Sequence, residues 1–378
     1  MRMNRSIAIF GLLSALAQYA VIIFFVLTLI SPAYAQWDDQ IRKRDSEVWH
    51  LGAPRCILAL PQPGKPTVQT ACPAGATCFP GEARPPPSDS PPPALPVCED
   101  GDLTLFNALL CFSGDEGGCS AVASAQNDVT GEWFRSPRLR TYPRLIKENS
   151  FSPDMALGLQ LWALLDPKIR RVNFQWWLNW LGRNQRCAGE GCTLRIPRFC
   201  PDDDVDGDPD AKLGCTMRPG DLATLSVVAS SMNTTINDAN FKNALRHWQS
   251  DAVMLAHSSA FTNDPDYPQH LAAVNILVLW QAGVRDPLLD KAAAHLASAQ
   301  PQNPFFAWLA GKRSPEVAAM TLAKCPAGAA DLPDEFNRYD WIWQRADDSD
   351  AWKHTMLWDC HFMAGVLLQN KSPKGGKK

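Results

Sequence analysis

From residue 102 onward, hydrophobic positions recur with the period of an α-helix, and the segments between them are rich in Pro, Gly and Asp. The clearest helix start is Ser152-Pro153-Asp154, where an N-cap serine precedes a proline at the first helical position. Helices are predicted over 153–165, 172–181, 221–231, 240–257, 270–282, 287–299, 304–310, 315–322 and 351–368. No alternating β-branched run is long enough for a central strand, so the predicted fold class is mainly α.

Several of these helices are apolar over much of their circumference, so each needs neighbours on more than one side, as two concentric layers would provide. The order of long helices and short turns resembles the (α/α) toroids of secreted carbohydrate-active enzymes. The segments EWFRSPR (132–138), SFSPDMALG (150–158), WQR (343–345) and WDC (358–360) also resemble those of uncharacterised secreted bacterial proteins. The resemblance spans most of 130–370 and implies an (α/α)-toroid or barrel-like helical array, with no established activity attached.

The N-terminus has the pattern of a signal peptide over residues 1–35. Arg2 and Arg5 precede an uncharged run over 6–30, and Ala33-Tyr34-Ala35 then forms a small-x-small cleavage site. As a helix, the run would reach about 37 Å, which is also enough for an uncleaved membrane anchor. Both interpretations place the rest of the chain outside the cytoplasm, and a membrane contact is expected only if the segment stays uncleaved.

All 12 cysteines follow this segment, which indicates a disulfide framework in an oxidising compartment. Loop closure favours short-range pairs, and a more distant pair would tie the last helix down. The expected pairs are Cys72–Cys78, Cys111–Cys119, Cys187–Cys192, Cys200–Cys215 and Cys325–Cys360. The chain has no Cys-x-x-Cys, which argues against structural zinc.

Composition divides the chain beyond residue 35 into three parts. Residues 36–100 hold many prolines and four cysteines, which predicts an irregular, disulfide-tied arm and connector. Residues 101–370 form the helical domain, and residues 371–378 form a basic tail that is expected to be disordered. The net charge of −3 and the absence of a basic stripe with interleaved aromatics exclude nucleic acid as an expected partner.

Six aspartates lie between Cys200 and Cys215 in the stretch CPDDDVDGDPDAKLGC. Their repulsion would be relieved by a bound dication, and an open, solvated loop is the alternative. With Asp202 as position 1 of a calcium loop, Gly207 falls at position 6, as the sharp turn requires. The predicted calcium ligands are Asp202, Asp204, Asp206, Asp208 and Asp210. Position 12 is Leu213 in place of the bidentate Glu, so a full EF-hand is not expected.

The common hydrolase motifs Gly-x-Ser-x-Gly, His-Glu-x-x-His and Walker A are absent, so acids carry the candidate chemistry. Asp154, at a helix start, is the first candidate, and a carboxylate there also simply complements the helix dipole. Glu132 and Asp359 each adjoin a tryptophan, and burial beside it could raise the pKa of either carboxyl as an acid requires. His270, which opens a helix, is a candidate for proton transfer or a structurally satisfied histidine.

Tryptophans and arginines are the candidate substrate contacts. Trp133 and Trp343 could stack on sugar rings, and core packing is the alternative for any of the 14 tryptophans. Arg135 and Arg345 could hold an anionic group, and ion pairs are the alternative. We therefore expect a secreted or periplasmic hydrolase or lyase that acts on a polysaccharide or glycan with paired carboxylates. The rivals are a non-catalytic envelope or glycan-binding protein and a membrane-anchored assembly factor.

Overall fold

The computed structural model describes residues 37–52, 103–135, 151–188, 190–200, 215–328 and 358–375, the short segments 55–57 and 69–71, and residues 140 and 331. This part of the chain is mainly helical, as the sequence predicts. The longer helices are α2 (Leu103–Ser113), α3 (Glu116–Ser124), α5 (Pro153–Leu165), α6 (Pro167–Arg183), α8 (Pro219–Ser231), α9 (Ala239–Trp248), α10 (Ala252–Thr262), α11 (Tyr267–Gln281), α12 (Pro287–Ala299), α13 (Pro304–Leu309), α14 (Ser314–Lys324) and α15 (Trp358–Leu368).

Short 3₁₀ turns and two small hairpins complete the described elements. The 3₁₀ turns are η1 (Trp49–Gly52), η2 (Glu190–Cys192) and η4 (Gln249–Asp251). Strands β1 (Arg55–Ile57) and β2 (Gln69–Ala71) pair antiparallel, as do β3 (Arg186–Ala188) and β4 (Leu194–Ile196). Each sheet has only two strands, so neither forms a central core element.

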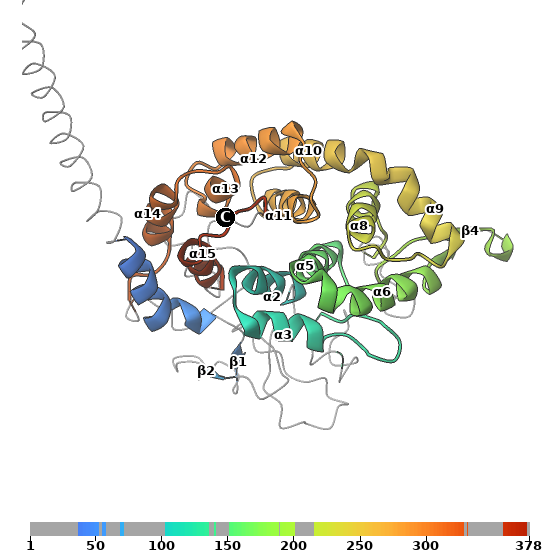
Figure 1. Cartoon of the computed structure of the whole chain (residues 1–378), viewed down its shortest axis with the longest axis horizontal. Coiled ribbons are helices and arrows are strands. Elements are labelled where there is room, and N and C mark those ends of the chain that lie inside the picture. The colour runs from blue at the N-terminus through green and yellow to red at the C-terminus, as the bar shows by residue number, and fades with distance from the viewer. Residues whose placement is uncertain are drawn as a thin grey trace, which may run out of the picture.

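The helices form two curved layers (Figure 1). Helices α2, α5, α8, α11, α13 and α15 lie inside, and α3, α6, α9, α10, α12 and α14 follow the outside of the arc. Burial agrees with this division. Every residue of α2 is buried, whereas α9 buries only Phe241 and Leu245. A helix that is apolar on all sides must be surrounded by others, which explains why the most apolar segments lie inside.

Helix α2 is approached at very short range by three neighbours, α3 through Gly118, α5 through Gly158 and α15 through Gly365. A Cβ built on Gly158 of α5 would lie 2.5 Å from Leu105 Cα, and one on Gly365 of α15 would lie 2.6 Å from Ser113 O. Only glycine leaves room for such backbone contacts. Gly158 and Gly365 therefore set the separation of the inner helices α2, α5 and α15.

Four of the expected disulfides are confirmed. Cys111–Cys119, Cys187–Cys192, Cys200–Cys215 and Cys325–Cys360 are all formed, with Cα–Cα distances from 4.6 to 6.0 Å. Cys72–Cys78 lies outside the described residues. The confirmed bridges are consistent with the oxidising compartment that the sequence indicates.

The start of the expected irregular arm is a helix, which corrects the sequence interpretation. Residues 37–47 are helical, and Ile41, Val48 and Trp49 are buried in the core. Trp49 Nε1 donates to Pro326 O at 2.9 Å, and Arg44 donates to Leu322 O at 2.8 Å. Apolar residues at helical spacing thus join this segment to the helical domain.

The described part of the expected disordered tail is also ordered. Trp308 Nε1 donates to Lys371 O at 3.0 Å, and Gln281 Nε2 donates to Pro373 O at 2.8 Å. Lys374 pairs with Asp290 at 2.8 Å. The tail is therefore held by its backbone carbonyls as well as by its charge.

No helix among the described residues is long and apolar enough to cross a membrane. The apolar run over 6–30 lies outside them, so the choice between signal peptide and anchor stays a prediction.

Candidate active site

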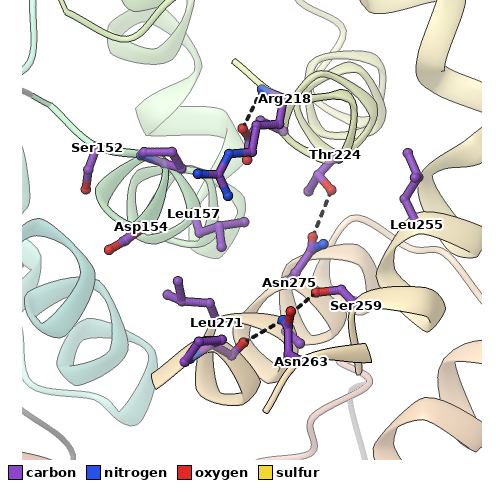
Figure 2. A pocket seen from close by; sticks show the side chains of 15 residues that line it. Ser152, Asp154, Leu157, Arg218, Thr224, Leu255, Ser259, Asn263, Leu271 and Asn275 are labelled. Atoms are coloured by element: carbon purple, nitrogen blue, oxygen red, sulfur yellow. Dashed lines mark hydrogen bonds between the residues drawn. The ribbon is translucent and has the colours of Figure 1, made fainter. Parts of the chain in front are cut away.

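A cavity of about 510 Å³ opens where the N-termini of α5 and α8 face α10 and α11 (Figure 2). Its size falls within the range of pockets that hold small ligands. Of the four sequence-predicted catalytic residues, only Asp154 lines it.

Asp154 lies in the first turn of α5, after the N-cap Ser152 and the N1 proline. The helix begins where the sequence predicts, and its first turn places Asp154 in the lining of the cavity. Tyr267 Oη, at the start of α11, donates to Asp154 Oδ2 at 3.1 Å. Asp154 is half-buried, so it is both positioned and accessible.

A second carboxyl group, Asp221, lines the cavity from the first turn of α8. Arg218 N donates to Asp221 Oδ2 at 2.8 Å. Burial raises the pKa of the Asp221 carboxyl to about 6, against the hydrogen bond and the charge of Arg218, which lower it. A carboxyl group with this pKa is partly protonated near neutral pH and can donate a proton.

The exposed Arg218 side chain reaches toward the side of the cavity that α5 forms (Figure 2). It adds a positive charge to a cavity that has two carboxyl groups. Its planar guanidinium can donate in parallel to two oxygens of an anionic group.

The opposite wall is lined by hydroxyl and amide groups (Figure 2). Thr224 Oγ1 donates to Asn275 Oδ1 at 2.8 Å, which joins α8 to α11. Asn263 Nδ2 donates to Ser259 Oγ at 3.0 Å and to Pro268 O at 3.1 Å. Such groups suit a ligand that carries several hydroxyls.

The chain matches no protein-family model, no curated protein and no solved structure.

His270 lies in the first turn of α11 and is fully buried. Its Nδ1 lies 3.1 Å from Asp266 O, and its Nε2 lies 3.0 Å from Asn303 Nδ2. A carbonyl only accepts and an amide nitrogen only donates, so these partners select the neutral imidazole with its proton on Nδ1. Burial lowers its pKa to about 4, against the hydrogen bond and charge of Asp266. In this structure His270 is part of a buried network and does not face the cavity.

The network continues from His270 through buried amides. Asn303 also donates to Gln300 Oε1 at 3.2 Å, and Gln300 donates to Gln269 Oε1 at 2.8 Å. Gln269 donates to Asn263 O at 3.1 Å. The chain of hydrogen bonds thus runs from the core to Asn263 in the cavity wall.

Two further acidic candidates lie elsewhere. Asp359 on α15 is fully buried, and its Oδ1 accepts from Cys360 N at 2.9 Å. Glu132 is half-buried in the segment after α3 and does not line the cavity. The structure therefore does not bring either residue next to Asp154.

The predicted substrate contacts are also distributed away from the cavity. Trp133 is 2% exposed and donates from Nε1 to Val122 O at 2.9 Å, so it packs in the core. Arg135 is half-buried near the start of α2, where its carbonyl accepts from Thr104 Oγ1 at 3.0 Å. Trp343 and Arg345 lie outside the described residues.

The expected calcium ligands, residues 202–210, also lie outside the described part of the chain. Elsewhere, the described residues contain no group of three His, Cys, Asp or Glu side chains that could hold a metal ion. The two ends of the aspartate loop are held together by a disulfide and a backbone hydrogen bond. Cys200 and Cys215 are buried and bonded, and Phe199 N donates to Cys215 O at 2.8 Å.

Asp221 and Arg218 are the cavity residues that the sequence reasoning missed. The signal was present, because Arg218-Pro219-Gly220-Asp221 repeats the arrangement of Ser152-Pro153-Asp154: a proline opens a helix and an acid follows in the first turn. Two such starts facing one cavity could not be read from the sequence, because that depends on how α5 packs against α8.

Proposed function

We propose that this protein hydrolyses a polysaccharide or glycan in the cavity between α5, α8, α10 and α11. The observation that carries the proposal is the pairing of two carboxyl groups on one cavity, one of which has a pKa raised to about 6. Glycoside hydrolysis uses one carboxyl group as an acid and another as a base or nucleophile. The polar wall of Thr224, Asn263 and Asn275 supports a polyhydroxylated substrate.

In this proposal Asp221 is the acid and Asp154 is the base. Asp221 donates its proton to the glycosidic oxygen as the bond from that oxygen to the anomeric carbon breaks. Asp154 takes a proton from a water molecule whose oxygen bonds to the same carbon. The hydroxyl of Tyr267 orients the Asp154 carboxylate.

We also propose that the protein is secreted or periplasmic and that its two helical layers close into a ring. Four disulfides and the signal-like N-terminus support a secreted or periplasmic location. The two curved layers of Figure 1 support an (α/α)-toroid, whose inner helix ends would surround the cavity.

The test is turnover of a panel of glycans by the purified protein and by the variants Asp221→Asn and Asp154→Asn. Each variant should lower kcat by about 100-fold or more while substrate binding is retained. Asp264→Asn is the matched control, because Asp264 is an exposed acid near the cavity that does not line it. Activity should also fall as the pH rises above about 6, since Asp221 then loses its proton.

Absence of turnover on every glycan, with glycan binding retained, would establish the non-catalytic glycan-binding function instead. In that case Asp221 would act only as a first-turn acid of α8, and Asp221→Asn would lower stability without affecting an activity.

We also propose that the aspartates of residues 202–210 bind calcium. The support is the match of Asp202, Asp204, Asp206 and Gly207 to the first half of a calcium loop, and the disulfide that closes the loop. The role proposed for the ion is structural. Because Arg218 follows Cys215 by only three positions, an ordered loop would support the α8 start that carries Arg218 and Asp221.

A further inference from the structure

A second cavity, of about 290 Å³, lies on the other side of α8. Its walls are the C-terminal half of α8, the segment 234–236, and one face of α9. At 100° per residue, Ser226 and Ser230 project from the face of α8 opposite to Asp221 and Thr224, which line the first cavity. The two cavities are therefore separate sites.

The second cavity is cationic. Lys242 and Arg246 lie one turn apart on α9 and both line it. Like charges at this spacing repel each other. No acidic side chain lines the cavity, and neither cation has an ion-pair partner within the described ranges. The nearby Asp238 is engaged elsewhere, since it caps α9 through Phe241 N at 2.8 Å and lies 3.8 Å from Arg195.

Neutral hydrogen-bonding groups complete the lining. Ser226 is only 5% exposed, and its hydroxyl makes no hydrogen bond to any residue that the structure describes. The hydroxyl of Ser226 is therefore free to donate to a ligand or to water in the cavity. Gln249 donates to Ser230 Oγ at 3.2 Å, which places two more polar side chains at the rim.

We propose that the second cavity binds a tetrahedral oxyanion, the phosphate or sulfate group of a polar ligand. Arg246 supplies a planar, multidentate donor, Lys242 supplies a compact charge, and Ser226 supplies a hydroxyl donor from the floor. A bound dianion offsets the repulsion between the two cations and accepts a hydrogen bond from the Ser226 hydroxyl. The oxyanion site is independent of the proposed hydrolase site, because the two cavities share no lining residue.

The test is calorimetric titration of the purified protein with sodium phosphate and sodium sulfate, with acetate and chloride at matched ionic strength as references. Phosphate or sulfate should bind saturably, and it should raise the melting temperature more than chloride does. The double variant Lys242→Gln/Arg246→Gln should weaken this binding by about tenfold or more, and Ser226→Ala by a smaller factor. The preferred anion distinguishes a phosphate ligand from a sulfate ligand.

The matched control is Lys168→Gln/Arg171→Gln, which removes the same charge from exposed positions on α6 outside both cavities. It should change the affinity less than twofold. The proposal is overturned if phosphate and sulfate stabilise the wild-type protein no more than chloride does, or if the control weakens binding as much as the double variant. Asp154→Asn and Asp221→Asn should leave oxyanion binding intact, so failure of the hydrolase proposal would be recognised separately.

Discussion

His361 of α15 lies between two carboxylates, with Nδ1 2.7 Å from Asp45 Oδ1 and Nε2 3.3 Å from Asp115 Oδ2. Asp45 belongs to the N-terminal helix over 37–47, and Asp115 caps α3 through Gly117 N and Gly118 N. One imidazolium therefore joins the helix over 37–47, α3 and α15.

This bridge predicts a loss of stability at alkaline pH. Hydrogen bonds and charges of the two aspartates outweigh burial and raise the pKa of His361 to about 9. Since the folded-state pKa exceeds the unfolded value of about 6.5, the stabilisation is complete below pH 6.5 and is lost as the pH rises through 9. It amounts to about 3 kcal/mol. Denaturant unfolding from pH 6 to 10 should show this decline, and His361→Gln should remove it.

The buried His270 predicts the opposite dependence. Its folded-state pKa of about 4 lies below the unfolded value, so its contribution is complete above pH 6.5 and falls by about 3 kcal/mol as the pH drops to 4. Together, the two histidines give a stability maximum near pH 6.5. Acid unfolding of His270→Gln should lack this slope between pH 6.5 and 4, although the variant is less stable at neutral pH. An unchanged slope in the variant would contradict the assignment.

Gly158→Ala should destabilise the protein by about 1–3 kcal/mol, because the added Cβ meets the backbone of α2. The control is Gly220→Ala at the start of α8, where a Cβ meets no atom within 4 Å. That change should be neutral or slightly stabilising, since alanine lowers the entropy of the unfolded chain. Urea unfolding midpoints compare the two, and equal midpoints would refute the close packing of α5 on α2.

The disulfides should differ in how much each contributes to the free energy of unfolding. Cys325–Cys360 closes a separation of 35 residues and Cys187–Cys192 one of 5. By chain entropy, replacing the first pair with serines should cost about 4 kcal/mol and replacing the second about 2 kcal/mol. Thermal melts of the two double variants show which loses more stability. A larger loss for the Cys187–Cys192 variant would count against the entropic explanation.

Calcium titrated into metal-stripped protein should bind saturably and raise the melting temperature. Asp202→Asn/Asp204→Asn/Asp206→Asn should abolish both effects, because it removes three carboxylates from the loop. Asp38→Asn/Asp39→Asn on the N-terminal helix is the control for general charge effects. If wild-type protein binds no calcium, the loop is a solvated, cysteine-closed segment.

Sequence patterns predicted the local structure where one segment determines it. The N-cap serine and N1 proline located the start of α5, and short loop closures identified four disulfides. The predicted helix over 240–257 is divided into α9 and α10 by the 3₁₀ turn η4 (Gln249–Asp251), which no sequence signal indicated.

The sequence was less informative wherever distant segments meet. The tryptophan at position 133 could serve a sugar cleft or the core, and only packing shows that it is buried. Likewise, the second cavity carboxyl, Asp221, became a candidate once α8 was seen beside α5. Residues that need a tertiary neighbour to define their environment could not be assigned from spacing alone.

The contacts of the helix over 37–47 with segments about 300 residues later bear on the order in which the protein folds. Trp49 bonds a carbonyl 277 positions later, and Asp45 bonds a histidine 316 positions later. Ile41 and Trp49 must therefore stay unburied until the segments up to α15 have been made. A chain truncated before α15 should leave the helix over 37–47 undocked, so the docking of α15 completes the folding of the described helices.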